Sequence, residues 1–522
     1  MNLGSYIGDV WQNGSGAGQS FVNPVSGEVL GFVDDDEIDT VKALEYARTV
    51  GFAELSDLSF RQRGAVLNSV AECLIKGKEA YYEIACRNGG NTKIDASIDV
   101  DGAIQTLKFY SKLATNLEDS CRILEPNSDF LSRDVDFKGY HIWSSRTGVA
   151  VHINAFNFPA WSLWEKVSVA MLAGIPSISK PATATGWLAY EMIRDVVEAN
   201  LLPKGSLSLI CGSGEKILKA LTEFDCISFT GSSETSKQIR SHPKVIQVSP
   251  RINVEADSVN SSILGPDVLP GSRLFDAFVD EVVKALSIKA GQFCTNIRRV
   301  HAPTEVCKDL EDAIVSKLEN LIVGDPKIDT VNVGPLVNKT QQQTALMGLG
   351  LLAEETKTQF GGGIPKFLEG CHSEEGSFLE PTLLHCSDPS SARFSHELEV
   401  FGPVSTVMPY KNETEAVDAI RKNCGALVLS VFTADTGFSG RIIENLAFNH
   451  GRILIVDESL QDDHSGHAIP LPQCTHGGPG RAGDGQELGG LRGLSFYMQR
   501  TSIQCSSNLM RNWSKNIALE NF

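Results

Sequence analysis

Four short apolar runs decide the fold: GVAVHINAF (148–156), IPSISK (175–180), LSLICG (207–212) and CISFTG (226–231). Sequences with helical periodicity lie between them, at SLWEKVSVAMLAG (162–174), WLAYEMIRDVVEANLL (187–202) and EKILKALTEF (215–224). Strands and helices that alternate at this spacing predict a parallel sheet covered by helices on both faces. Nucleotide cofactors bind at the carboxyl ends of such strands, which directs attention to NAFNFP, SKPA, CGSG and FTGS.

A second α/β block follows, from about residue 271 to ILIVD at 453–457. It has a helical pattern at 272–288 and strand-like runs at VSTVMPY (404–410) and ALVLSVFT (426–433). The first 115 residues have mainly helical patterns, the first of which Asp36 or Asp39 can cap. The chain is therefore predicted to be α/β, with two blocks that share an interface.

Two further segments alternate like strands. DVDFKGYHIWSS (134–145) predicts an antiparallel hairpin with Gly139 at its turn, and LSFYMQRTSIQ (494–504) predicts a strand near the C-terminus. VIQVSPRINV, before Glu255, is also rich in β-forming residues. Neither 134–145 nor 494–504 can bury its apolar face alone, so we expect a homodimer or a larger homo-oligomer.

Composition limits the possible functions. The chain has 522 residues with a net charge of −18, 42% hydrophobic and 21% charged residues, which is typical of a globular protein and excludes a largely disordered one. The acidic balance argues against nucleic acid as a partner. Because no run approaches roughly 20 apolar residues and the N-terminus has no leader pattern, we expect a cytoplasmic protein without a membrane partner.

The twelve cysteines are scattered, with no C-x-x-C pair and no paired Cys/His spacing. Such scatter predicts reduced thiols and no metal site. Cys294, in Gly-Gln-Phe-Cys-Thr (291–295), is distinguished by its neighbours, since Gly291 permits a tight turn and a thiol at a turn can have a lowered pKa. The alternative for Cys294 is a buried small hydrophobic residue.

Two more residues could carry chemistry. Glu255 follows a β-rich run, where burial would raise its pKa toward neutrality and suit it as a general base; the alternatives are a solvated loop acid or a helix cap. Asn157, in Ala-Phe-Asn-Phe-Pro, can cap the following helix or donate its amide to a developing oxyanion.

These segments together resemble the aldehyde dehydrogenase superfamily, in order and in local sequence. The resemblance rests on NFP at 157–159 with Lys166 nine residues on, SKPA (179–182), FTGS (229–232), Glu255, GQFCT (291–295) and EVFGPV (399–404). It spans nearly the whole chain. It implies a Rossmann-like cofactor domain, an α/β catalytic domain and a small β oligomerisation element.

The resemblance also implies residue roles. Cys294 would add to the aldehyde, Asn157 and the Cys294 N–H would hold the oxyanion, and Glu255 would activate the water that hydrolyses a thioester. Lys166 resembles a lysine on the helix beneath the nicotinamide, with a structural surface lysine as the alternative. The remaining residues would bind the cofactor: Lys180 at the adenosine ribose, Gly231 and Ser232 at the pyrophosphate, and Glu399 and Phe401 at the nicotinamide end.

One departure concerns the cofactor. Members that prefer NAD commonly carry Glu three residues after the SKPA lysine, but this chain has Thr183. A carboxylate there repels a 2′-phosphate, whereas a hydroxyl can donate to it. We therefore expect NADP to be preferred and NAD to be possible.

Other departures indicate the substrate. EADSVN (255–260), Ser236 in place of a glycine, and HGGPGRAGDGQELGG (476–490) resemble the dehydrogenase portion of the bifunctional ring-opening enzyme of phenylacetate degradation and stand-alone relatives of benzoate degradation. They imply a CoA-linked semialdehyde as substrate. Candidates for binding the CoA phosphates are Arg298, Arg299, Arg481 and Arg492, each with a structural role as the alternative.

The predicted domains follow the family fold. Residues 1–126 and 146–270 would form the cofactor domain, 271–458 the catalytic domain, and 127–145 with 494–522 the oligomerisation element, with 459–493 as a glycine-rich loop that returns to the cofactor domain. Three alternatives remain for function: a non-catalytic dehydrogenase-like protein, a CoA-acylating enzyme, and a dehydrogenase of small aldehydes with broad specificity.

Overall fold

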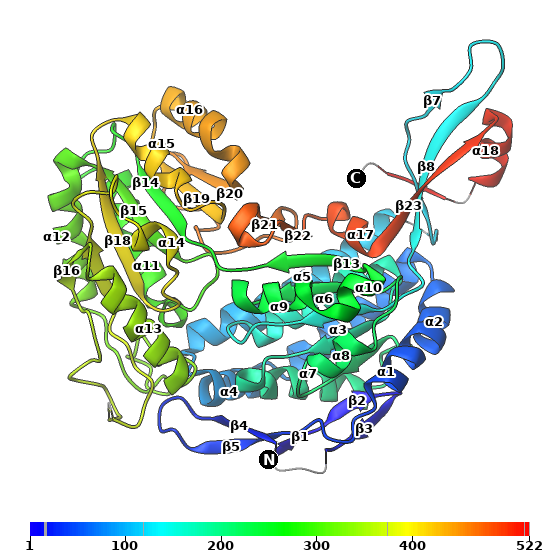
Figure 1. Cartoon of the computed structure of the whole chain (residues 1–522), viewed down its shortest axis with the longest axis horizontal. Coiled ribbons are helices and arrows are strands. Elements are labelled where there is room, and N and C mark those ends of the chain that lie inside the picture. The colour runs from blue at the N-terminus through cyan, green and yellow to red at the C-terminus, as the bar shows by residue number, and fades with distance from the viewer. Residues whose placement is uncertain (15–17, 118, 373, 516, 521–522) are drawn as a thin grey trace.

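Two seven-stranded sheets lie side by side in the computed structural model, which describes residues 1–14, 18–117, 119–372, 374–515 and 517–520 (Figure 1). The first sheet has the order β13-β12-β9-β10-β11-β2-β3. Its first five strands in this order are parallel, and β2 and β3 form an antiparallel edge. The strands are β2 (Ser5–Ile7), β3 (Val10–Gln12), β9 (Ala150–Ile153), β10 (Ser177–Lys180), β11 (Leu207–Leu209), β12 (Cys226–Thr230) and β13 (Arg251–Glu255).

Helices cover both faces of this sheet, as the sequence predicted. Ala150 of β9 packs into one core and its neighbour Val151 into the other, because successive side chains of a strand point to opposite faces. One layer consists of α3 (Phe60–Lys76), α4 (Lys78–Gly89), α5 (Lys93–Asn116), α6 (Pro159–Ala173) and α7 (Gly186–Glu198). The other consists of α1 (Thr40–Tyr46), α8 (Glu215–Lys219), α9 (Ser233–Ser241) and α10 (Pro243–Val248).

Local signals explain where these helices begin. Asp39, one of the two caps that the sequence offered, accepts a hydrogen bond from Lys42 N, and Ser59 and Thr92 form capping boxes at α3 and α5. Pro159 stands at the first turn of α6, where a missing N–H costs nothing. The prediction that VIQV belongs to a strand is wrong, because Pro243 begins α10 there.

The second sheet has the order β16-β17-β18-β15-β14-β19-β20, with β16 antiparallel to the rest. Its strands are β14 (Asn260–Leu264), β15 (Ile297–Pro303), β16 (Lys357–Phe360), β17 (Thr382–His385), β18 (Val404–Tyr410), β19 (Ala426–Phe432) and β20 (His450–Val456). Because β14 belongs to this sheet, the chain passes from the first sheet to the second before residue 260, ahead of the predicted boundary at 270.

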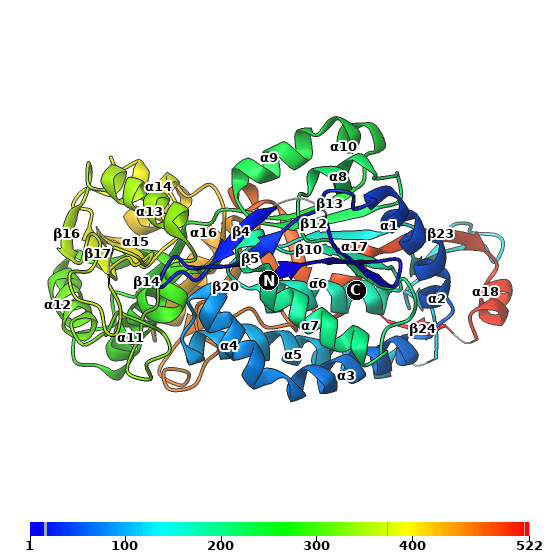
Figure 2. The same ribbon diagram turned by 90° about the horizontal axis from the view of Figure 1, so that it is seen from below.

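Helices also pack on both faces of the second sheet. The strand β19 is buried along its whole length, as expected for a parallel strand covered on both sides. The helices are α11 (Arg273–Ser287), α12 (Cys307–Leu318), α13 (Lys339–Leu352), α14 (Phe394–Glu397), α15 (Glu413–Arg421) and α16 (Thr436–Leu446). Figure 2 shows this lobe beside the lobe built on the first sheet.

An arm projects from the first lobe (Figure 1). It is a sheet of β6 (Ile123–Leu124), β7 (Asp129–Phe130), β8 (Lys138–Ser145), β23 (Met498–Cys505) and β24 (Ala518–Leu519), with α18 (Ser507–Trp513) beside it. The predicted hairpin therefore exists, but its turn lies between β7 and β8, and Gly139 is inside β8. The predicted C-terminal strand begins only at Met498, because 491–497 form the helix α17 (Leu491–Tyr497).

The glycine-rich segment forms a ribbon between the two lobes. Its strands are β21 (Thr475–Gly478) and β22 (Gly485–Leu488), paired antiparallel around the short helix η6 (Gly480–Ala482). The ribbon is tied to the first sheet, since Gln486 N donates to Asn253 Oδ1 at 2.7 Å and Ala256 N donates to Ala482 O at 2.9 Å. It thus closes over the carboxyl end of β13.

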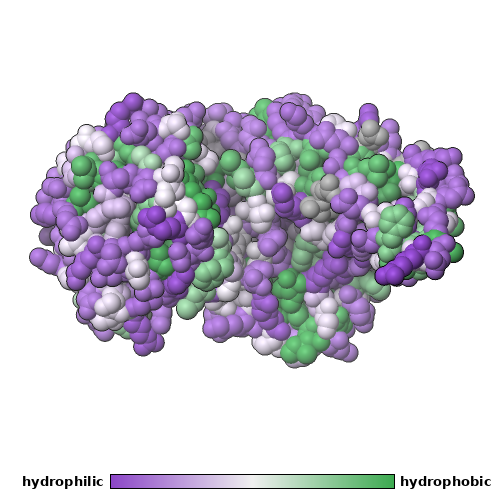
Figure 3. Space-filling model, turned by 90° about the horizontal axis from the view of Figure 1, so that it is seen from above, coloured by the Kyte–Doolittle hydropathy of each residue, from purple (hydrophilic) through white to green (hydrophobic). Residues whose placement is uncertain are grey.

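The remaining elements are short. They are β1 (Asn2–Leu3), β4 (Gln19–Val22), β5 (Val29–Val33), α2 (Phe52–Ser56) and the turns η1 (Ala47–Gly51), η2 (Thr183–Thr185), η3 (Ile288–Gly291), η4 (Thr304–Val306) and η5 (Ala447–Asn449). In the part of the chain that the structure describes, no helix combines the length and apolarity needed to cross a membrane. The face drawn in Figure 3 is mostly hydrophilic, with hydrophobic residues in separate groups.

Candidate active site

The carboxyl ends of the parallel strands meet at one edge of the first sheet and face the second lobe. The loop after β9 brings Asn157 there, β10 ends at Lys180, and β12 leads into Gly231 and Ser232. Together with Glu255, Cys294, Glu399 and Phe401, these residues line one cavity of about 490 Å³. The structure thus unites all but two of the catalytic and cofactor-binding residues that the sequence predicted, the exceptions being Lys166 and Thr183.

Cys294 lies in a tight turn between η3 and β15. Gly291 has φ +69°, and a Cβ there would lie 2.2 Å from Gly402 O, so only glycine fits. Lys289 and Ala290 also have left-handed backbone, each with φ +49°. Asn260 Nδ2 fixes the turn by donating to Cys294 O at 2.8 Å and to Asn296 O at 3.1 Å.

Cys294, Glu255 and His476 form the centre of the site. His476 Nε2 lies 2.8 Å from Glu255 Oε2, and the Cys294 thiol donates a hydrogen bond to the Glu255 carboxylate. Glu255 and His476 are buried, and Cys294 is half-buried. The general base predicted from the sequence therefore has an ion-pair partner.

Glu255 has a lower pKa than expected from its position. Burial alone would raise the pKa of Glu255, but His476, Lys166 and the Cys294 thiol outweigh it and lower the pKa below the ordinary value. The same pair raises the pKa of His476 despite burial. The prediction of a carboxyl group with a raised pKa is wrong, because the histidine is distant in sequence and only the fold brings it to Glu255.

For the Cys294 thiol, the direction of the predicted pKa shift is also reversed. Burial, followed by the charge of Glu255 and its hydrogen bond, raises the pKa of Cys294 well above the ordinary value, and Glu399 and Glu165 act in the same direction. The prediction of a lowered thiol pKa is wrong, because burial and the neighbouring carboxylates act more strongly on the sulfur than the nearby His476 does.

His476 is the residue that sequence reasoning missed. It begins the HGGPGRAG segment, which served only as a signature of the subfamily. Its place in β21, beside the carboxyl end of β13, depends on how the ribbon closes over the first sheet. The available signal was a lone histidine beside glycines, a combination that does not identify its partner.

Asn157 reaches the site from the loop before α6. Its Nδ2 donates to Gln292 O at 3.1 Å and makes no second hydrogen bond to the residues that the structure describes. Phe158 and Phe293 pack edge to face with their rings 4.4 Å apart and hold the loop against the Cys294 turn. Asn157 does not cap α6, whose N-cap residue is Phe158.

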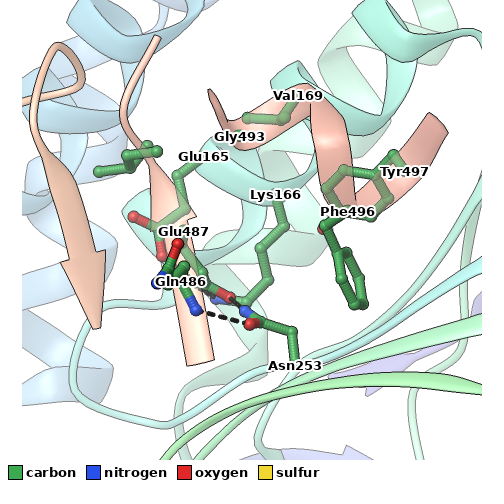
Figure 4. Close-up of a pocket in the computed structure, with 10 residues that line it drawn as sticks. Glu165, Lys166, Val169, Asn253, Gln486, Glu487, Gly493, Phe496 and Tyr497 are labelled. Carbon is green, nitrogen blue, oxygen red and sulfur yellow. Dashed lines mark hydrogen bonds and ion pairs between the residues drawn. The ribbon is translucent and has the colours of Figure 1, made fainter. Parts of the chain in front are cut away.

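Lys166 is one of the two residues that do not line the main cavity. Its ammonium group is buried and pairs with Glu165 at 3.1 Å and with Glu487 at 3.2 Å (Figure 4). Ser228 and Asn253 donate to the other oxygen of Glu487. Burial would lower the pKa of Lys166, but Glu487, Glu165 and Glu255 raise it. The alternative of a surface lysine is wrong.

A second cavity adjoins Cys294. Glu165 belongs to it and also to the Lys166 cluster, so it stands between the two. It is small, about 30 Å³, and is lined by both aromatic and polar side chains: Asn157, Phe158, Trp161, Ser162, Glu165, Thr230, Glu255, Phe293, Cys294, Thr295, Pro470 and His476. Cys294 therefore faces two spaces, one between the lobes and one beside α6.

The larger cavity has features that fit a nucleotide. Asn154 and Thr230 line it, and their side chains are buried without a hydrogen-bond partner in the described part of the chain. Because buried polar groups normally have hydrogen-bond partners, these two side chains indicate a polar ligand. Ser232 caps α9 at the same wall and accepts a hydrogen bond from Thr235 N, so the helix N-terminus faces the cavity region.

Glu399 and Phe401 form the wall contributed by the second lobe. Glu399 Oε1 lies 3.3 Å from Arg298 Nη2, and Ser258 N donates to Glu399 Oε2 at 3.0 Å. Burial raises the pKa of Glu399 to about 7, against the opposing charge of Arg298. Phe401 packs edge to face on Phe156.

Thr183 is the second residue outside the main cavity. It begins η2, directly after Ala182, which lines the cavity beside Lys180. The Lys180 side chain is largely buried, and burial lowers its pKa against the charges of Cys211 and Asp35. Thr183 thus stands half-buried at the rim of the cavity.

The four arginines proposed for the CoA phosphates have different surroundings. Arg298 and Arg299 are buried and bonded to main-chain carbonyls, which makes them structural. Arg481 lines a separate hollow with Lys237 and Arg240, and Arg492 is exposed on α17. The candidates at 298 and 299 are therefore wrong.

Comparison with known proteins agrees with this geometry. A family model described as the aldehyde dehydrogenase family matches residues 11–503. A 3,4-dehydroadipyl-CoA semialdehyde dehydrogenase of Aromatoleum evansii is 45% identical over 92% of this chain and 93% of its own.

Solved structures show the same fold at low identity. A betaine aldehyde dehydrogenase of Staphylococcus aureus in complex with NAD⁺ superimposes with a TM-score of 0.83 at 23% identity, covering 97% of this chain and 95% of that one. The HpcC protein of Thermus thermophilus gives a TM-score of 0.85 at 22% identity, covering 97% and 93%.

The charge of Glu255 should control the reactivity of Cys294. Because that charge and its hydrogen bond raise the pKa of the thiol, Glu255→Gln should lower this pKa and move the midpoint of Cys294 alkylation to lower pH. Peptide mass spectrometry after iodoacetamide treatment over a pH series measures the shift. Cys371 is an internal control, since burial and Asp325 set its pKa. An unchanged or higher midpoint at Cys294 would contradict this electrostatic account.

Proposed function

The chain belongs to the aldehyde dehydrogenase family, and on this premise we propose that it oxidises a CoA-linked semialdehyde to the carboxylic acid, with NADP preferred to NAD. The family and the fold drawn from the sequence motifs are confirmed. The observation that carries the proposal is the position of Cys294, at the junction of two cavities and in contact with Glu255. A thiol so placed can meet an aldehyde from one side and a hydride acceptor from the other.

The first step is covalent capture. Cys294 Sγ adds to the aldehyde carbon as its proton passes to Glu255, which already accepts the thiol hydrogen bond. His476 keeps the Glu255 carboxylate ionised and so ready to receive that proton. The oxyanion that forms would accept hydrogen bonds from Asn157 Nδ2, which bonds only Gln292 O among the described residues, and from the Cys294 N–H.

The larger cavity would hold the dinucleotide. Lys180 would bind the adenosine ribose, Gly231 and Ser232 the pyrophosphate, and Glu399 with Phe401 the nicotinamide ribose. The buried Asn154 and Thr230 side chains provide further unpaired polar groups on this wall of the described chain. Bound there, the cofactor supplies the hydride acceptor that turns the captured aldehyde into a thioester.

The last step is hydrolysis of the thioester on Cys294. A water molecule attacks the acyl carbon, Glu255 takes its proton, and the acid leaves as the C–S bond breaks. Lys166, Glu165 and Glu487 form a buried polar cluster next to Glu255, and Lys166 would therefore support Glu255 rather than contact the reacting atoms.

The substrate class rests on the Aromatoleum relative, and the hydrolytic outcome rests on Glu255. The name of that relative specifies a CoA-linked semialdehyde. The general base Glu255 favours hydrolysis over transfer of the acyl group to free CoA. Glu255, Asn157 and Cys294 together disfavour a non-catalytic protein, and a dehydrogenase of small aldehydes is the alternative that substrate comparison tests.

Substitution of the two central residues tests the mechanism. Cys294→Ala should reduce turnover at least about 10³-fold, because no other thiol among the described residues lines the two cavities that meet there. Glu255→Gln should slow steady turnover about 10²- to 10⁴-fold while preserving a burst of one NADPH per site, because deacylation needs the base. Stopped-flow absorbance with a CoA-linked semialdehyde and with free aldehydes measures both.

Cys424→Ser, at an exposed cysteine, is the matched control and should keep full activity. Unimpaired turnover in Cys294→Ala would refute the mechanism. Equal kcat/KM for free and CoA-linked aldehydes would support the broad-specificity alternative.

Thr183 tests the cofactor proposal. A carboxylate at 183 would repel the 2′-phosphate, so Thr183→Glu should lower kcat/KM with NADP about 10- to 100-fold and leave the value with NAD nearly unchanged. Thr183→Gln, which has similar size without the charge, separates repulsion from bulk. A wild-type enzyme that uses NAD as well as NADP, or better, would contradict the proposed preference.

The arm supports a homodimer or a larger homo-oligomer. In the described part of the arm β23 is an edge strand, and Phe130, Leu509 and Trp513 expose 75%, 57% and 48% of their surface. Light scattering at micromolar concentration should give a mass of at least twice 56.5 kDa. Trp513→Glu should lower that mass, whereas Phe367→Glu, at a residue 90% exposed in the second lobe, should not. A wild-type monomer would contradict this proposal.

A further inference from the structure

Three metal-binding side chains converge beside the catalytic sulfur. A carboxylate oxygen of Glu255, Cys294 Sγ and a ring nitrogen of His476 all lie within 4.8 Å of one another. They come from three different elements: the end of β13, the turn before β15, and β21. Paired Cys/His spacing in the sequence could not reveal this group, because its members are far apart along the chain.

We propose that Glu255, Cys294 and His476 form a zinc site, and that Zn²⁺ bound there inhibits the enzyme reversibly. The bound ion would engage the nucleophile Cys294 and the general base Glu255 at the same time. Binding of the ion requires only the three side chains, and its inhibitory effect rests on the function proposed above.

The donor set matches zinc. Zn²⁺ binds thiolate at about 2.3 Å and imidazole or carboxylate at about 2.0–2.2 Å in a tetrahedron, so its ligand atoms stand roughly 3.3–3.8 Å apart. Cys294 Sγ, within 4.8 Å of the other two donors, would need to approach them by at most about 1 to 1.5 Å, and His476 Nε2 and Glu255 Oε2, 2.8 Å apart, would need to separate by about 0.5 Å. The fourth position would face the cavity that Cys294 shares with Asn157, where water can complete the tetrahedron.

The surroundings favour a cation at this point. Glu165 and Glu399 act on the Cys294 sulfur with negative charge, and Glu255 is itself a carboxylate. A divalent ion would replace the charge that His476 supplies now. Thiolate and imidazole are poor ligands for hard cations, so Mg²⁺ should not compete.

The backbone that carries the ligands is held in place before any ion arrives. Asn260 clamps the carbonyl of Cys294, and His476 pairs across the ribbon with Glu487. A Cβ at Gly477 would lie 2.0 Å from Gly485 O, which shows how closely the ribbon strands approach. Preorganised ligands reduce the cost of assembling the site.

Binding is an exchange of protons for metal. The S–H bond of Cys294 breaks as an S–Zn bond forms, and the imidazolium N–H between His476 and Glu255 gives way to N–Zn and O–Zn bonds. Both protons leave to solvent, and no atom is oxidised or reduced. A chelator therefore restores the free thiol.

Cobalt provides a direct readout that does not need turnover. Titration of Co²⁺ into the cofactor-free full chain should give thiolate-to-cobalt charge-transfer and four-coordinate d–d bands at one equivalent per chain. Zn²⁺ should abolish these bands by displacement, and Mg²⁺ in excess should not. Absence of the bands in the wild-type protein would overturn the proposal without any variant.

Variants assign the ligands. His476→Gln and Cys294→Ala should each weaken Co²⁺ binding at least about 100-fold, more than the loss typical of a group that only orients a ligand. Cys474→Ser, at an exposed cysteine two residues from His476, should keep the bands. Charge-transfer bands that persist in Cys294→Ala would assign the metal to another thiol and overturn the site.

An activity assay tests inhibition separately. Zn²⁺ should stop aldehyde oxidation, and EDTA should restore it fully. An active enzyme without cobalt bands would refute the metal site alone, whereas cobalt bands in a protein that oxidises no aldehyde would refute the proposed function alone. Activity that Zn²⁺ leaves unchanged, in a protein that shows the bands, would overturn the inhibitory role.

Discussion

The parallel register of β9, β10, β12 and β13 is the constraint on which the site depends. It delivers Asn157, Lys180, Ser232 and Glu255 to one edge, because parallel strands present their carboxyl ends together. The second sheet brings Cys294 and Glu399 to the opposite wall. A cavity between two lobes follows, and the glycine-rich ribbon closes it from a third direction with His476.

Much of this frame could be predicted from the sequence, because buried parallel strands are continuous apolar runs with polar residues at their ends. The runs at 150–153, 177–180 and 226–230 are strands, and the residues that follow them line the cavity. Alternation of apolar and polar residues predicted strands less reliably. Residues 494–497 of the alternating segment 494–504 belong to the helix α17, and Gly139 lies inside a strand because the tight turn falls earlier.

The errors at the site have a single physical origin. The pKa of Glu255 depends on His476 and that of Cys294 depends on Glu255, so neither can be deduced from its own neighbours in sequence. The ribbon residue His476 lowers the pKa of Glu255, and burial together with the Glu255 charge raises that of Cys294. The same reason explains Arg298 and Arg299, whose basic character suggested a surface until the fold buried them against main-chain carbonyls.

Charge balance within the site completes the argument. Among the described residues, the carboxyl groups of Glu165, Glu255, Glu399 and Glu487 are paired with only three cationic side chains, on Lys166, His476 and Arg298. Burial makes this imbalance costly, and accordingly the pKa values of Glu165 and Glu399 are both raised to about 7. A thiolate would add one more negative charge, so burial and these carboxyl groups together raise the pKa of Cys294. Any cation that enters the cavity, whether on a cofactor ring or as a metal ion, relieves the same imbalance and favours the thiolate. The site, like the whole chain with its net charge of −18, therefore has more acidic than basic groups among the residues described.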